Sequence, residues 1–176
     1  FASSASQTEH SEDLSDLAVR SIKIRINDSD FDRMLGKLQP DMVLFDRFIV
    51  EEQLGWRVAE HSPNSIRVLN TEDLHSLRRA RREALAQSKE CTHSYWLQHP
   101  DTLRELASIL RCDLSLLISE TELKWLQKAA VIPDNLLFYL PFMLDSIKYY
   151  KTESYKTFDI RSDFLFAGHG KHLPNE

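Results

Sequence analysis

The chain has 176 residues, 42% of them hydrophobic, and a formal net charge of −5 at pH 7. That length suits a single domain with an ordinary globular core, and the acidic balance argues against nucleic-acid binding, which requires a basic face. No apolar run reaches the ~20 residues that span a bilayer, and no signal peptide opens the sequence. Cys91 and Cys112 lack the CxxC spacing of a zinc or dithiol site. We therefore expect free thiols in a reducing, cytoplasmic compartment.

The first elements alternate between short strands and helices. Asp13–Leu17 predicts a short helix, and the alternation of apolar and basic residues over Ile22–Ile26 predicts a half-exposed strand. A cluster of N-cap residues precedes a helix predicted over Asp30–Leu38. Met42–Phe45 is a short apolar run typical of a buried parallel strand. Val50–Ala59 then carries an apolar stripe at helical spacing.

The second half continues this alternation. Its predicted elements are, in chain order, a strand at Ile66–Leu69, a helix at Leu74–Lys89, a loop or frayed helix at Cys91–Trp96, a helix from Pro100 to about Leu110, a strand at Asp113–Ser119, a helix to about Ala130, a strand at Leu136–Leu144 and a strand at Phe164–Ala167. In the helix that begins at Pro100, we expect Leu103, Leu106, Ala107 and Leu110 to form the buried stripe.

The repeated order of strand and helix predicts an α/β fold, with a Rossmann-like parallel sheet and helices on both faces. The strands expected to share this sheet lie near Ile22, Val43, Val68, Leu116 and Phe138. The segment Asp145–Ser162 is polar and has no apolar period, so we expect it to be a linker, with Phe164 outside the sheet.

Polar residues directly follow two of the predicted strands. Asp46 and Arg47 come after the first apolar run, and Asp73 and His75 come after the next strand. Because open α/β sheets bind ligands at the carboxyl ends of their strands, these four residues are candidates for ligand contact. Structural interpretations remain open: Asp46 and Arg47 as a local ion pair, and Asp73 as the N-cap of the next helix. The sequence has no Gly-rich phosphate loop, HExxH or GxSxG motif.

Other notable residues also have structural interpretations. Glu51 and Glu52 suit the first turn of a helix, where the dipole favours acids, and Trp56 is expected to pack in the core. A run of arginines is usually a solvated helix face. The alternative is a functional one, in which the arginines bind an anionic membrane surface. The arginines in question are Arg78, Arg79, Arg81 and Arg82.

Several segments, taken in order, resemble a known enzyme family. The most specific are FDRFIVEEQLGWR at residues 45–57 and the G-x-x-x-H-x-PN loop at residues 168–175, with RVLNTEDLHSLR and CDLSLLIS between them. They resemble the group 1, GT4-like glycosyltransferases, which have the GT-B fold. Such enzymes transfer a sugar from a nucleotide-sugar to an acceptor between two Rossmann-like domains. No metal or other cofactor is expected, since basic groups and helix dipoles can stabilise the leaving diphosphate.

The resemblance implies a domain organisation. Residues 1–145 resemble most of the acceptor-side N-terminal domain with an incomplete first strand, residues 146–162 a linker, and residues 163–176 the start of the donor-side C-terminal domain. On this interpretation Asp46, Arg47, Asp73 and His75 are acceptor-side candidates. The acidic donor motif would lie beyond Glu176, so the chain alone is expected to be inactive.

The last predicted loop supplies the donor-phosphate candidates Gly168, His169 and Lys171, because backbone amides and a cation suit a diphosphate. The chain departs from the family pattern at Asn70, where Asp is usual, and at Gly170, where an aromatic residue is usual. The first departure concerns acceptor handling and the second concerns the shape of the loop. The rival interpretation is a non-catalytic Rossmann-like binding or scaffold module.

Overall fold

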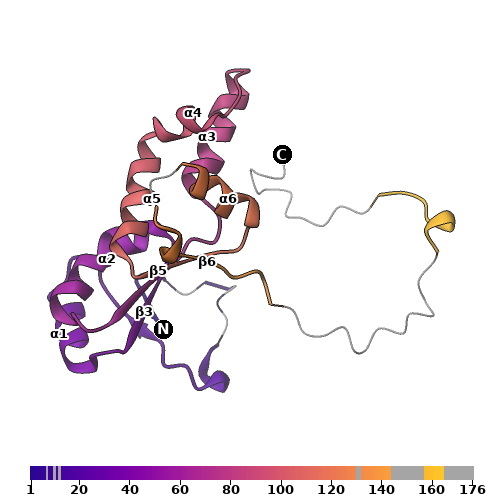
Figure 1. Cartoon of the computed structure of the whole chain (residues 1–176). Coiled ribbons are helices and arrows are strands. Elements are labelled where there is room, and N and C mark those ends of the chain that lie inside the picture. The colour runs from indigo at the N-terminus through magenta and orange to yellow at the C-terminus, as the bar shows by residue number, and fades with distance from the viewer. Residues whose placement is uncertain (7, 10, 12, 130–131, 144–156, 165–176) are drawn as a thin grey trace. The chain divides into compact units, whose positions relative to one another are not determined.

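The computed structural model describes residues 1–6, 8, 9, 11, 13–129, 132–143 and 157–164 (Figure 1). The chain divides into two compact units, residues 1–142 and 143–176. The described elements of the first unit are β1 Ala2–Ser3, η1 Ser15–Leu17, β2 Ile22–Lys23, α1 Ser29–Leu38, β3 Met42–Asp46, α2 Phe48–His61, β4 Ile66–Asn70, α3 His75–Ala86, α4 His93–Leu97, α5 Pro100–Arg111, β5 Leu114–Leu117, α6 Glu120–Lys128, η2 Asp134–Leu136 and β6 Leu137–Tyr139. In the second unit the described element is η4, Phe158–Ile160.

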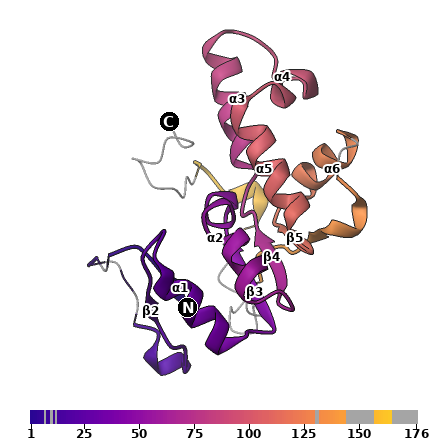
Figure 2. The same ribbon diagram turned by 90° about the vertical axis from the view of Figure 1, so that its left-hand side faces the viewer.

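Four parallel strands form the central sheet, in the order β3-β4-β5-β6. β3 and β4 pair from Met42 opposite Ile66 to Asp46 opposite Asn70, and β5 and β6 follow in the same direction. The predicted α/β class, with a Rossmann-like parallel sheet flanked by helices, is confirmed. Figures 1 and 2 show α3 and α4 at one end of the first unit, with β2 and α1 toward the other.

Alternation along the strands determines which side chains reach the core. Phe45, Leu69 and Leu117 are at most 2% exposed, and they share one apolar cluster with Leu54 of α2 and Leu106 of α5. Successive residues of a strand point to opposite faces of the sheet, and residues paired on neighbouring strands point to the same face. The cluster therefore joins α2 and α5 to one face of the sheet.

The opposite face of β3 and β4 carries apolar side chains that remain accessible. Met42, Leu44 and Ile66 are 57%, 56% and 49% exposed. The register that buries Phe45 and Leu69 also directs these three side chains to the other face.

Capping side chains begin several helices as the sequence predicts. Asp28 accepts a hydrogen bond from the amide of Asp30 at the start of α1, over 2.8 Å. Ser119 does the same for α6, accepting from the amide of Glu122 over 3.4 Å. Thr92 caps α4, the short helix that forms within the segment expected to be a loop or frayed helix. Such caps satisfy amides that have no partner inside the helix.

The strand near Ile22 does not belong to the central sheet, contrary to the expectation from the sequence. β2 instead pairs in parallel with β1, with Ala2 opposite Ile22. Ile24 is buried, whereas Lys23 and Arg25 are exposed. The alternation predicted a half-exposed strand correctly. It could not predict the partner, because strand pairing depends on backbone hydrogen bonds that a side-chain pattern does not encode.

Two core predictions on helices are wrong. Trp56 is 51% exposed, and the guanidinium of Arg57 lies 4.5 Å from its ring centroid. On α5, Leu103 and Leu110 are exposed, although both fit a helical stripe through Leu106. The buried residues of α5 are Thr102, Glu105, Leu106, Ser108 and Ile109. Leu106 belongs to both patterns, so spacing alone could not choose between them.

Candidate functional site

Two strand-end clusters were predicted, Asp46 with Arg47 after β3 and Asp73 with His75 after β4. They lie next to each other at the carboxyl edge of the sheet. Asp46 ends β3 opposite Asn70 of β4, and the amide of Arg47 donates to the carbonyl of Asn70 over 2.8 Å. The predicted ion pair is present, with Asp46 Oδ2 and Arg47 Nη2 3.0 Å apart and both side chains exposed. Arg47 also has a φ of 70°, which is uncommon for a residue other than glycine. Strained backbone of this kind concentrates at functional sites.

His75 joins this edge from the other cluster. It is the first residue of α3 and is buried, at 7% exposure, rather than lying on an open loop. Its Nδ1 lies 3.1 Å from the carbonyl oxygen of Asp73 and 3.3 Å from Oδ1 of the same residue. The imidazole meets the ring of Phe48, the residue after Arg47, edge-on at 6.1 Å. With Nδ1–H donating to Asp73, Nε2 is the ring nitrogen able to accept a proton, and it has no hydrogen bond among the described residues.

A buried carboxylate of α5 holds the start of α3. Glu105, 2% exposed, accepts hydrogen bonds from the amide of His75 at 3.0 Å and from the amide and hydroxyl of Ser76 at 3.0 and 2.6 Å. Trp96 Nε1 donates to the same hydroxyl over 2.8 Å. Burial raises the pKa of Glu105 to about 7, although the hydrogen bonds from Ser76 and His75 act in the opposite direction.

A second carboxylate completes the cap of α3. Glu122 of α6 accepts from the amide of Leu74 over 3.2 Å, and burial raises the pKa of Glu122. Asp73, predicted to be the N-cap, instead forms an ion pair with Arg78 at 2.7 Å, since Leu74 occupies the cap position. The first amides of α3 are therefore bound by the protein's own carboxylates. They are not free to bind the phosphate that a helix N-terminus often accepts.

Neither Glu105 nor Glu122 was predicted from the sequence. Glu105 lies three residues after Thr102 and four residues before Ile109. The helical stripe of buried residues that includes Glu105 was therefore visible in the sequence. A glutamate is rarely buried, however, and the exposed leucines of α5 gave an equally regular stripe. Glu122 sits at the third helical position after Ser119, where it suits a capping box without predicting a contact with α3.

The acids of the FDRFIVEEQLGWR segment join α2 to α5. Glu51 is 2% exposed, and its two carboxylate oxygens bind Arg111 Nε at 3.0 Å and Nη2 at 2.5 Å. Glu52 binds Arg104 in the same two-pronged way, at 2.9 and 2.5 Å. Paired arginine–carboxylate hydrogen bonds are among the stronger charged contacts in proteins. Both acids therefore connect helices, beyond the first-turn role expected for them.

The last residues of the segment also have packing roles. A Cβ on Gly55 would collide with the carboxylate of Glu51, so a larger residue here requires that carboxylate, which binds Arg111 of α5, to shift. Arg57 is 8% exposed and pairs with Asp32 of α1 at 2.6 Å. Most of the FDRFIVEEQLGWR segment therefore makes contacts that hold α2 against α1 and α5. Only its first residues lie at the edge of the sheet.

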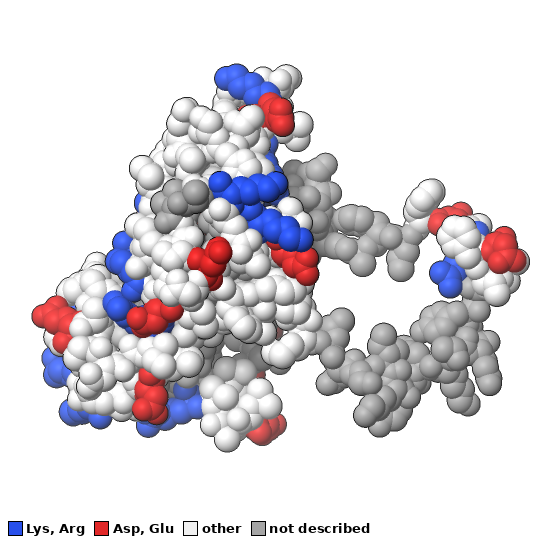
Figure 3. Space-filling model, in the orientation of Figure 1, with Lys and Arg blue, Asp and Glu red and all other residues white. Residues whose placement is uncertain are grey.

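The arginines of α3 do not form a uniform basic surface. Arg78 is paired with Asp73, Arg79 is paired with Asp101, and Arg81 lies 5.5 Å over the ring of Trp125. Arg82 is exposed and has no partner among the described residues. On the face drawn in Figure 3, basic and acidic side chains are interspersed. Contact with an anionic membrane surface therefore stays a prediction. It would depend mainly on Arg81 and Arg82, which have no acidic partner among the described residues.

The donor-phosphate candidates Gly168, His169 and Lys171 lie outside the described residues. So does most of the predicted strand that begins at Phe164, and much of the predicted linker. Phe164 itself is fully exposed and is not in a strand. Across the described part of the chain, no group of His, Cys, Asp or Glu side chains is arranged to hold a metal ion. No described helix has the length and apolar character needed to cross a membrane.

Comparison with known proteins gives no relative: no protein-family model, curated protein or solved structure matches this chain.

Proposed function

We propose that this chain is part of a GT-B glycosyltransferase, in which the carboxyl edge of the described sheet binds the acceptor sugar. The observation that carries this proposal is the meeting of the two strand-end clusters. The hydrogen bond from Arg47 to Asn70 and the ring contact between Phe48 and His75 bring both sets of candidates to one place. Parallel sheets bind ligands at this edge.

The chemistry of the edge suits a sugar hydroxyl. Asp46 and Arg47 are exposed and offer an acceptor and a donor of hydrogen bonds to a polyhydroxyl ligand. His75, oriented through Nδ1 by Asp73, has Nε2 left to accept the proton of the attacking hydroxyl. The nucleotide-sugar would be bound by another part of the enzyme, to which Gly168, His169 and Lys171 belong on this proposal.

One observation fits both this proposal and the alternative, a non-catalytic Rossmann-like binding or scaffold module. The amides that open α3 are already bound by Glu105 and Glu122, so this helix end cannot stabilise an anionic group. A scaffold needs no such group. The acceptor side of a glycosyltransferase needs none either, because the diphosphate would be bound elsewhere.

Titration of the ¹⁵N-labelled chain with free sugars and with nucleotide-sugars tests the proposal. We expect sugars to shift the amide resonances of Arg47, Phe48 and His75, with weak dissociation constants of ~1–10 mM for so few contacts. His75→Asn should weaken these shifts, because asparagine can keep a hydrogen bond to Asp73 but lacks Nε2. The matched control is His61→Asn, at the far end of α2.

The outcomes separate the two candidate functions. Shifts confined to the carboxyl edge, weakened by His75→Asn and unchanged by His61→Asn, support the acceptor-side proposal. Absence of sugar-dependent shifts at millimolar concentration would favour the scaffold. Shifts from nucleotide-sugars at this edge, stronger than those from free sugars, would contradict the assignment of the edge to the acceptor.

A further inference from the structure

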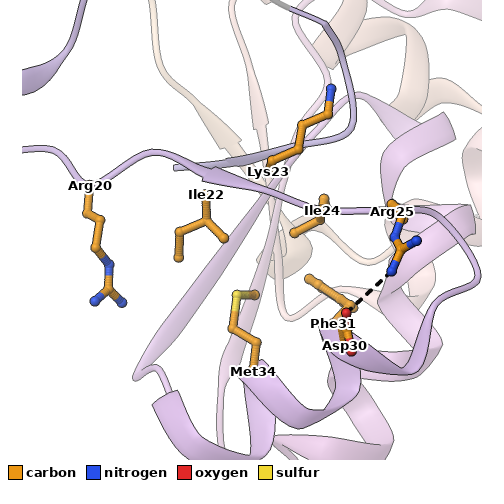
Figure 4. A pocket seen from close by; sticks show the side chains of 8 residues that line it. All are labelled: Arg20, Ile22, Lys23, Ile24, Arg25, Asp30, Phe31 and Met34. Atoms are coloured by element: carbon orange, nitrogen blue, oxygen red, sulfur yellow. Dashed lines mark hydrogen bonds and ion pairs between the residues drawn. The ribbon is translucent and has the colours of Figure 1, made fainter.

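A hollow of about 540 Å³ lies between β2 and α1 (Figure 4). Figure 2 shows these two elements at the end of the first unit opposite α3 and α4. Its apolar lining comes from Ile22 and Ile24 of the β2 segment and from Phe31 and Met34 of α1. Figure 4 shows Ile22 and Met34 facing each other, with Arg20 to one side of them and Arg25 to the other. Hollows of roughly 300–1,000 Å³ are the usual size for small-molecule sites.

A second hollow, of about 490 Å³, adjoins the first along α1. The two share Arg20, Asp30 and Met34, and the second adds Arg33, Lys37 and Leu38. Together they make one concave surface with an apolar floor and a rim on which basic side chains outnumber acidic ones. This surface shares no residue with the candidate acceptor edge and does not depend on the function proposed for that edge.

The basic side chains of the rim differ in how far they are neutralised. Arg25 pairs with Asp28 at 2.8 Å and with Asp30 at 3.5 Å, and Arg33 pairs with Asp30 as well. Lys23 turns away from the hollow and donates to the carbonyls of Ser4 and Ala5, at 2.9 and 2.6 Å. These contacts bind three of the five nearby cations to groups of the protein itself.

Arg20 and Lys37 are the exceptions. Among the described residues, neither side chain has a hydrogen bond or an ion pair. Both line the second hollow, together with the apolar side chains of Met34 and Leu38. Two uncompensated cations at a concave apolar surface raise the local concentration of anions, even though the chain as a whole is acidic.

We propose that this double hollow binds a small amphiphilic anion, namely a phosphate monoester with an aromatic or alkyl body. The phosphate group would lie between Arg20 and Lys37, where its oxygens can accept charge-assisted hydrogen bonds. The body would cover Met34 and enter the apolar space between Ile22 and Phe31. Neither half of the ligand is sufficient by itself, because the cations are exposed and the apolar floor is small.

Titration of the ¹⁵N-labelled chain with phenyl phosphate tests the site. We expect shifts at the amides of Ile22–Arg25 and Met34–Leu38, and at least about tenfold weaker binding of inorganic phosphate and of benzyl alcohol, since each lacks half of the interactions. Affinity for phenyl phosphate should also fall as salt is raised from 50 to 200 mM, roughly as expected for exposed ion pairs.

Variants separate this site from general charge attraction. Arg20→Gln and Lys37→Gln should each weaken phenyl phosphate binding about fivefold or more, because each removes one charged contact. Arg82→Gln, an exposed cation on α3, is the matched control and should leave binding unchanged. Equal weakening by all three variants, equal binding of phenyl phosphate and inorganic phosphate, or shifts outside the double hollow would each overturn the proposal. Spectra of the unliganded variants that match the wild-type spectrum exclude misfolding as the cause.

Discussion

Glu105 provides a quantitative test of the buried cap on α3. Its pKa is raised from 4.5 to about 7 in the folded chain, chiefly by burial. Because the folded-state value is the higher one, the folded chain binds more protons than the unfolded chain between these pH values. The stability that Glu105 contributes therefore falls as the pH rises through this window, by about 3 kcal/mol for a shift of this size.

The assay compares the wild-type chain with Glu105→Gln by urea unfolding at pH 5.5, 6.5, 7.5 and 8.5, followed by tryptophan fluorescence. Glutamine is nearly isosteric, cannot ionise, and keeps one oxygen for the amides that Glu105 binds. The wild-type chain should lose stability relative to the variant as the pH rises. Carboxylates with lowered pKa, such as Glu52 beside Arg104, are present in both proteins and cancel in the difference.

A difference in unfolding free energy that stays constant across this pH range would contradict the raised pKa of Glu105. Glu105 would then have the same pKa in the folded and unfolded chains. It could not be a buried carboxylate of α5 that binds the first amides of α3. A second variant, Ser76→Ala, serves as a check. It removes the hydroxyl that donates to Glu105 at 2.6 Å, and so it should raise the pKa of Glu105 further and steepen the pH dependence.

Three further predictions concern the packing of the described unit. Gly55→Ala should lower stability by ~1–3 kcal/mol because its Cβ collides with the carboxylate that joins α2 to α5, and a gain from better helix propensity would contradict this packing. Phe45→Ala should cost ~3–5 kcal/mol in urea unfolding, whereas Leu44→Ala on the accessible face should cost under ~1 kcal/mol, and equal costs would mean that the register is wrong. Cys112, whose pKa burial raises to about 12, should react with a thiol reagent only after unfolding, and rapid reaction of the native chain of a Cys91→Ser variant would exclude its burial.

Local patterns predicted much of the fold. The apolar run at Met42–Phe45 formed a strand of a parallel sheet, but it is an edge strand with Met42 and Leu44 exposed and not the buried strand that was predicted. The N-cap residues Asp28 and Ser119 began helices where expected. These predictions depend on chemistry within a few residues of the chain, such as the satisfaction of free amides at a helix start. They hold because no distant contact competes with that chemistry.

Predictions that depend on distant partners were less successful. Trp56 is large and apolar, yet it lies on the outer side of α2 because the inner side is set by Leu54 and Val58. The strand near Ile22 pairs with the first residues of the chain, a choice that its alternation does not reveal. Glu105 is buried because it binds amides of α3, thirty residues earlier in the sequence. No local rule predicts such a contact.

The places of the candidate residues in the fold were predicted from the sequence, but their surroundings were not. Asp46, Arg47, Asp73 and His75 were identified from their places after two strands, and the sheet topology brings the two pairs to one edge. Their roles in ligand binding stay predictions. The burial of His75 could not be deduced from the sequence, because it follows from its contacts with Phe48 and Asp73.

Sugar transfer is the most direct test of the proposed function. The protein encoded by the longest open reading frame that contains this chain would be incubated with a panel of nucleotide-sugars and free sugars. Release of nucleoside diphosphate would be measured by mass spectrometry. We predict release that depends on the acceptor, reduced ~100-fold or more by His75→Asn, as for loss of a general base, and unchanged by His61→Asn. Residues 1–176 alone should release none. Full activity of His75→Asn would contradict the role assigned to His75, and absence of release with every donor would contradict the glycosyltransferase proposal itself.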